Sequence, residues 1–160
     1  MILQGKQYGM RHQKKVVKEY PLDLKLSATP TLDDVYKTVE VICEHFKKLI
    51  EDNQLCKLLY DKNGKRKHES AAQLLFFGIA DAYCSANNLD ISPESDAGRG
   101  PVDFKVSKGA NIKVLVEVKL TSNSKLEKGF TSQLPIYQKS EKSHKGIYLV
   151  IHNMEISENR

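Results

Sequence analysis

The sequence predicts an α/β domain in which a mixed sheet is flanked by helices, with an extra helical region at the N-terminus. Helical patterns span residues 31–49 and 68–87, and apolar strand patterns span residues 102–106, 114–120 and 146–151. A short strand is expected at 89–92 and a last helix at 132–142. With 160 residues the chain has the length of one ordinary domain. We divide it into a helical region, residues 1–66, that packs on or precedes an α-β-β-β-α-β core, residues 67–160.

The first helix has a clear start signal. Thr31 is a hydroxyl N-cap, and Asp34 places a carboxylate at the third helical position, which predicts a capping box. Apolar residues then recur every three or four positions, at Leu32, Val35, Val39, Ile42, Phe46 and Leu49. This stripe indicates packing and carries no chemistry.

A polar, basic loop at residues 61–67 leads into the second helix, His68 to Asn87. The middle of this helix, residues 71–80, is apolar nearly all round, which predicts that it is buried. Glu69 lies in the first turn, where a carboxylate ordinarily complements the helix dipole. It shares a helical face with Gln73 and Phe76, so it can also point along the face that meets the sheet.

The strand Val114–Leu120 carries two charged residues in an apolar run. Side chains two apart share a face of a strand, so Glu117 and Lys119 project together with Leu115. Burying a carboxylate and an ammonium on a central strand is costly unless each has a partner. A plain ion pair on an edge strand is the alternative.

Residues 108–111 form a turn, which predicts a hairpin between the strands on either side. A three-residue loop centred on Ala110 places Asp103 directly opposite Glu117, on the same face. Because opposed like charges are destabilising, this register needs compensation, and a divalent cation is the obvious candidate. A slip of one residue would break the pairing.

The expected last helix begins at a Ser132 N-cap and ends near Lys142. Gln133 and Tyr137 lie four residues apart and therefore share a face. They are candidates to contact a substrate phosphate or the end of a strand.

These residues fit metal-assisted phosphodiester hydrolysis. Mg²⁺ binds hard oxygen ligands, and one or two carboxylates with waters suffice, so Asp103 and Glu117 can hold it. Lys119, on the same face, can orient the attacking water and lower its pKa. Glu69 can reach the site from its helix to hold a metal-bound water or a second metal.

The arrangement resembles the PD-(D/E)xK nuclease superfamily, which has the restriction-endonuclease-like fold. The matching pieces are Glu69, Pro101-Val102-Asp103, Glu117-Val118-Lys119 and Gln133-Leu134-Pro135-Ile136-Tyr137. The last resembles the Q-x-x-x-Y motif of the RecB-like exonuclease branch. The resemblance covers residues 67–151, and Val102 interrupts the literal Pro-Asp dipeptide.

The resemblance implies a metal-dependent deoxyribonuclease. It would make Asp103, Glu117 and the Val118 carbonyl the ligands of Mg²⁺, for which Mn²⁺ should substitute. Lys119 would be the water-positioning base and Glu69 an accessory acid. The implied set of catalytic residues is Glu69, Asp103, Glu117, Lys119, Gln133 and Tyr137.

Other readings of these patterns stay open. Asp103 and Lys105 could form the acid-lysine pair, with Asp96 upstream, although Asp96 lies among turn formers. A non-enzyme with a nuclease-like fold could bind nucleic acid or scaffold a larger complex. The first helix could mediate a homodimer.

Charge and composition limit the expected binding partners, cysteine chemistry and cellular location. Lysine and arginine number 25 against 20 aspartates and glutamates, a net charge of +5 that favours a polyanion such as DNA. The candidate DNA contacts are Lys62, Lys65, Arg66, Lys67, Lys139, Lys142 and Lys145. Three cysteines without a C-x-x-C pair argue against zinc clusters and disulfide frameworks. No membrane span or signal peptide is apparent, and we expect a cytoplasmic protein.

Overall fold

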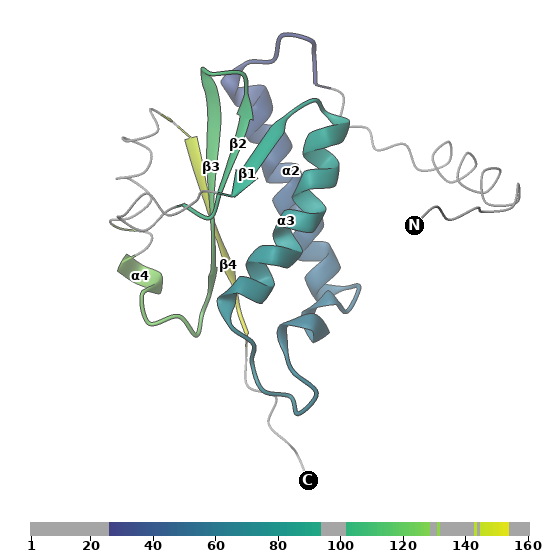
Figure 1. The fold of residues 1–160 in the computed structure, drawn as a ribbon, viewed down its shortest axis with the longest axis vertical. Helices are drawn as coiled ribbons and strands as arrows, with labels where there is room; N and C mark the ends of the chain where they lie inside the picture. The colour runs from purple at the N-terminus through teal and green to yellow at the C-terminus, as the bar shows by residue number, and fades with distance from the viewer. Residues whose placement is uncertain (1–25, 94–101, 129–130, 132–142, 144, 154–160) are drawn as a thin grey trace, which may run out of the picture.

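The computed structural model describes residues 26–93, 102–128, 131, 143 and 145–153 (Figure 1). Its elements, in chain order, are helix α2 (Leu32–Glu51), the 3-10 helix η1 (Leu55–Leu59), helix α3 (Glu69–Ala86), strands β1 (Asp90–Pro93), β2 (Phe104–Lys108) and β3 (Ile112–Leu120), the short helix α4 (Leu126–Lys128) and strand β4 (Lys145–Ile151).

The four strands form one sheet in the order β1-β2-β3-β4. The pairs β1–β2 and β2–β3 are antiparallel, and β3–β4 is parallel. The two long helices lie beside each other and against the sheet (Figure 1). The predicted α/β class, with a mixed sheet flanked by helices, is therefore confirmed.

Helix α2 begins as its sequence predicts. The Thr31 side chain accepts a hydrogen bond from the Asp34 N–H at 3.2 Å, and the Thr31 N–H donates to the Asp34 carboxylate at 2.9 Å. The predicted apolar stripe is buried, at Val35, Val39, Ile42 and Phe46. It belongs to the same core as α3 and β3, so residues on both sides of position 67 share one core.

Strand β3 presents different chemistry on its two faces, as its alternation predicts. Val114, Val116, Val118 and Leu120 pack into the main core with α2 and α3. On the opposite face Leu115 packs with Val102 and Tyr148. Glu117 and Lys119 lie on this second face, and both are buried.

The hairpin register is also confirmed. Phe104 pairs with Val116 and Lys105 pairs with Leu115, which places Asp103, one residue before β2, opposite Glu117. The turn is residues 109–111, and Gly109 has a φ of +63°, which a residue without a Cβ adopts at little cost.

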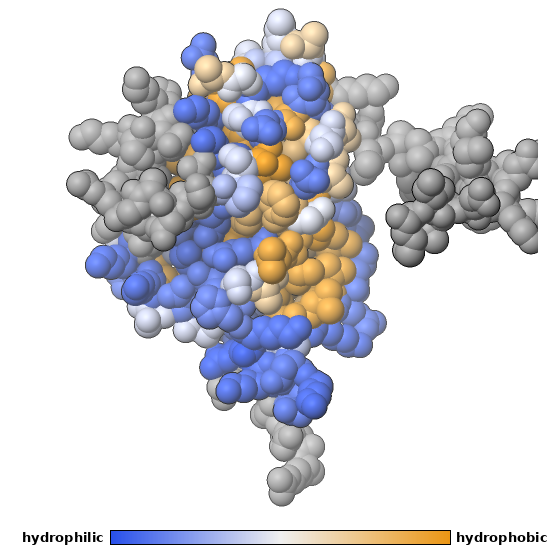
Figure 2. All heavy atoms as spheres, viewed as in Figure 1, coloured by the Kyte–Doolittle hydropathy of each residue, from blue (hydrophilic) through white to orange (hydrophobic). Residues whose placement is uncertain are grey.

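The burial predicted for α3 is only half right. Ala72, Phe76, Ala80 and Cys84 line its buried face, but Leu74 is 71% exposed. The sheet and α2 cover one side of this helix, so an apolar strip on the other side stays exposed. Figure 2 shows this strip as a hydrophobic area over α3, bordered by polar residues.

Several expectations fall outside the described residues. They include the helix expected at 132–142 and both of its candidate residues, Gln133 and Tyr137. Among the parts of the chain that the structure describes, no helix is both long enough and apolar enough to span a membrane.

We predict that Phe76→Ala lowers the free energy of unfolding by about 3–5 kcal/mol. The Phe76 side chain is fully buried and meets Phe46 edge-to-face, with ring centroids 5.4 Å apart. Leu74→Ala on the exposed side of α3 is the control and should cost less than about 0.5 kcal/mol. Urea denaturation measures both, and equal losses would contradict the packing described here.

Candidate functional site

The ammonium group of Lys119 lies among three carboxylates. Its Nζ is 2.8 Å from Glu117 Oε1, 3.1 Å from Glu69 Oε1 and 3.7 Å from Asp103 Oδ2. The four side chains come from the start of α3, the residue before β2, and β3. The structure therefore brings together all the predicted site residues that it describes.

Two of these carboxylates accept hydrogen bonds from N–H groups of β3 that lie beyond its pairing with β2. Strand β2 begins at Phe104, opposite Val116, so β3 runs on beyond it. Asp103 Oδ2 accepts a hydrogen bond from the Val118 N–H at 2.6 Å, and Glu69 Oε2 accepts one from the Leu120 N–H at 3.0 Å. Since N–H groups two residues apart point to the same side of a strand, the two acids continue the ladder that β2 leaves unfinished.

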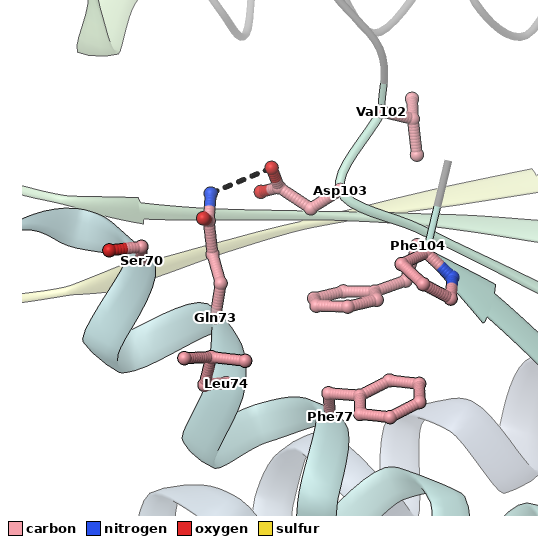
Figure 3. A pocket seen from close by; sticks show the side chains of 8 residues that line it. Ser70, Gln73, Leu74, Phe77, Val102, Asp103 and Phe104 are labelled. Atoms are coloured by element: carbon pink, nitrogen blue, oxygen red, sulfur yellow. Dashed lines mark hydrogen bonds between the residues drawn. The ribbon is translucent and has the colours of Figure 1, made fainter. Parts of the chain in front are cut away.

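Two amide side chains hold the acids in place, and sequence reasoning assigned neither a role. Gln73 Nε2 donates to Asp103 Oδ1 at 2.7 Å, and Asn123 Nδ2 donates to Glu69 Oε2 at 2.8 Å. The Gln73 contact is drawn in Figure 3. Its position four residues after Glu69 was a usable signal, because the two share a helical face. Asn123 follows the end of β3 and carried no signal.

Glu117 is the most deeply buried acid of the group, with 1% of its surface exposed. One carboxylate oxygen contacts Lys119, but the other, Oε2, is buried and has no hydrogen-bond partner among the described residues. A buried carboxylate oxygen without a donor or cation is costly. Glu117 is therefore the acid of this group that has an oxygen still able to accept a hydrogen bond or bind a cation.

The pKa values of the four groups move in different directions. Burial raises the pKa of Asp103, and burial together with the Asp103 charge raises that of Glu117. Burial alone would raise the pKa of Glu69, but hydrogen bonds from Asn123 and the Leu120 N–H lower it below the ordinary value.

Burial alone would lower the pKa of Lys119, but its hydrogen bond to Glu117 and the charges of Asp103, Glu117 and Glu69 hold it above the usual value. Lys119 is thus a cation, and its one positive charge is shared by three carboxyl groups, which carry an excess of negative charge when all three are ionised. That excess favours a further positive charge at this place.

The same Asp103 forms part of the wall of a pocket of about 500 Å³. Figure 3 shows the pocket between α3 and the start of β2. Its lining comes from Ser70, Gln73, Leu74 and Phe77 of α3, and from Pro93, Val102, Asp103 and Phe104. The lining is mainly apolar, with three polar residues, Ser70, Gln73 and Asp103, of which Asp103 also pairs with Lys119.

The basic residues fall into two groups. Lys62, Lys65 and Lys67 are exposed on a turn that leads directly into α3, and Arg66 lies between them. Asp61 Oδ1 accepts hydrogen bonds from the Asn63 and Lys65 N–H groups and so shapes this turn.

The second group has a different setting. Lys145 pairs with Asp33 at 3.1 Å and lies over the Tyr36 ring, so it is engaged with α2. Lys139 and Lys142 lie outside the described residues, as does Asp96 of the alternative acid-lysine pairing.

A family model described as a domain of unknown function, DUF8371, matches residues 35–155. The chain belongs to this family. No curated protein and no solved structure matches the chain. The DUF8371 match covers α2 from Val35 onward, the sheet and every described member of the site. The buried residues of the main core, from Val35 to Ile151, all lie within it.

We predict that Lys119→Met lowers the free energy of unfolding by about 3–5 kcal/mol, because it leaves three carboxylates without their shared cation. Chemical denaturation at neutral pH measures the loss. Lys125→Met removes a charge from an exposed lysine and is the matched control, expected to change stability by less than about 0.5 kcal/mol. A Lys119→Met protein as stable as the control would show that the acids do not depend on Lys119.

Proposed function

We propose that this chain is a metal-dependent nuclease that hydrolyses DNA phosphodiester bonds, built on the restriction-endonuclease-like core of the PD-(D/E)xK superfamily. The observation that carries the proposal is the meeting of Asp103, Glu117 and Lys119 at the end of β3, where Glu117 Oε2 is buried and has no hydrogen-bond partner in the part of the chain that the structure describes. The order α3-β1-β2-β3 and the parallel β4 agree with that core.

The donor set fits Mg²⁺, with Mn²⁺ as a substitute. Asp103, Glu117 and the Val118 carbonyl would hold the ion, which would stabilise charge on the phosphate oxygens and lower the pKa of a bound water. Within the described residues no group of three or more histidine, cysteine, aspartate or glutamate side chains is arranged to hold a metal. Mg²⁺ commonly uses one or two carboxylates and keeps several waters, so two acids and a carbonyl are sufficient.

Lys119 has the role of orienting the attacking water. Its raised pKa keeps it as an ammonium, which donates hydrogen bonds and does not accept a proton. This favours the orienting role over that of a general base. Glu69 acts through Lys119, to which it is hydrogen-bonded at 3.1 Å, and Gln73 fixes the orientation of the Asp103 carboxylate. Glu69 accepts three hydrogen bonds, from Lys119, the Leu120 N–H and Asn123, whereas Asp103 accepts two, so Glu69 serves better as a positioning residue than as a metal ligand.

DNA is the substrate that the charge distribution favours. Lys62, Lys65 and Lys67 are exposed on the turn that ends at the first residues of α3, next to Glu69. Lysines in this place attract the phosphate backbone and direct it toward the acids. They bring no sequence preference of their own.

A nuclease-like domain that only binds nucleic acid or scaffolds a complex is the second candidate. One observation favours it: Lys119 already neutralises part of the acidic cluster, so the cluster can hold α3 and β3 together without a metal. The two candidates differ in whether the acids bind a divalent cation.

We expect calorimetry to detect Mg²⁺ and Mn²⁺ binding to the wild type and to find it abolished in Asp103→Asn and Glu117→Gln. Cleavage of linear, circular and single-stranded DNA, assayed with the same proteins, should require the metal and fall by at least about 100-fold in both variants. Glu127→Gln, at an exposed acid on α4, is the control and should behave as the wild type.

The outcomes separate the two candidates. Wild-type protein that binds neither cation contradicts the nuclease proposal and leaves the binding or scaffolding domain. Metal binding and cleavage that survive in Glu117→Gln would contradict the roles given to these residues.

A further inference from the structure

The pocket beside Asp103 has the features of a ligand site. Its volume of about 500 Å³ lies in the range of small-molecule sites, which are largely apolar with a few polar groups that fix orientation. Leu74 lines the pocket and is 71% exposed, the largest exposed fraction among the large hydrophobic side chains of the described residues.

Two stacked aromatic rings, those of Phe77 and Phe104, line one side of this pocket. Phe77 is partly exposed, and its ring stacks on that of Phe104, with centroids 5.8 Å apart and planes 20° from parallel. Phe104 is buried and also packs against Phe76 at 5.5 Å. The stacking on Phe104 restricts the Phe77 ring, which lines the pocket together with Phe104 (Figure 3).

The pocket is continuous with the charged site. Asp103 lines the pocket, and its Oδ2 lies 3.7 Å from Lys119 Nζ. Gln73 lines it as well and donates to Asp103. A ligand seated there has its apolar part against Phe77 and Leu74 and its other end at Asp103.

We propose that this pocket takes an unpaired nucleobase of single-stranded DNA, the one next to the phosphate at the Asp103–Glu117–Lys119 site. The inference rests on the proposed function for the position of the phosphate. A base is flat and stacks on an aromatic ring regardless of its identity, and such stacking contributes about 1–3 kcal/mol per base. The Gln73 amide, which carries both a donor and an acceptor, lies where it can meet the polar edge of the base.

The test compares two labelled single strands of equal length and charge, one with bases and one made of abasic units. Fluorescence anisotropy gives the affinity for each in EDTA, so that the result does not depend on metal-dependent cleavage. The wild type should bind the strand with bases about 5- to 150-fold more tightly.

Leu74→Glu places a charge at the pocket mouth and should bring that ratio close to one. Leu58→Glu is the matched control, since Leu58 is 51% exposed and does not line the pocket, and it should keep the wild-type ratio. Because the ratio compares strands of equal charge, the repulsion between the new glutamate and the phosphates cancels.

A wild-type ratio near one, a ratio unchanged in Leu74→Glu, or no binding of either strand overturns the inference. Cleavage with a ratio near one would overturn the base pocket and keep the nuclease. A base-dependent ratio that Leu74→Glu abolishes supports the pocket even if no metal-dependent cleavage is found, and in that case only the nuclease proposal fails.

Discussion

The buried ammonium of Lys119 is the constraint on which the rest of this structure depends. A lysine in this position is tolerable only if acids reach it from several directions, and they come from α3, from the entry to β2 and from β3 itself. The helix must therefore lie with its first turn at the end of β3, and the hairpin must keep its register. The aromatic contacts of Phe76 with Phe46 and Phe104 hold α3 at that place.

The two faces of strand β3 carry side chains of different kinds. Its valines face the helices and form the core, while Glu117 and Lys119 face the other way. Beyond the first residue of β2, the carboxylates of Asp103 and Glu69 accept hydrogen bonds from the N–H groups that a longer β2 would have paired. The carboxylates that accept these backbone hydrogen bonds thus lie close together. Carboxylates that complete the hydrogen bonding of the sheet are in this way also placed where a cation could bind them.

Local patterns made much of this predictable. The capping box at Thr31, the alternation of β3 and the short turn around Ala110 each depend on neighbouring residues, and together they place Asp103 opposite Glu117. Contacts between distant segments were harder. Asn123 meets Glu69 only because the loop after β3 passes the start of α3, and the exposure of Leu74 depends on how far the sheet and α2 extend over α3. The sequence of α3 alone, apolar on nearly every side, predicted burial where the fold leaves a pocket.

The most direct test of the central claim is the anomalous diffraction signal of Mn²⁺ in crystals of the wild-type protein. We predict a peak bonded to oxygens of both Asp103 and Glu117, with Glu117 Oε2 among its ligands. Crystals saturated with Mn²⁺ that show no peak there, with Lys119 still the cation shared by the acids, would contradict the claim that this cluster binds a divalent metal.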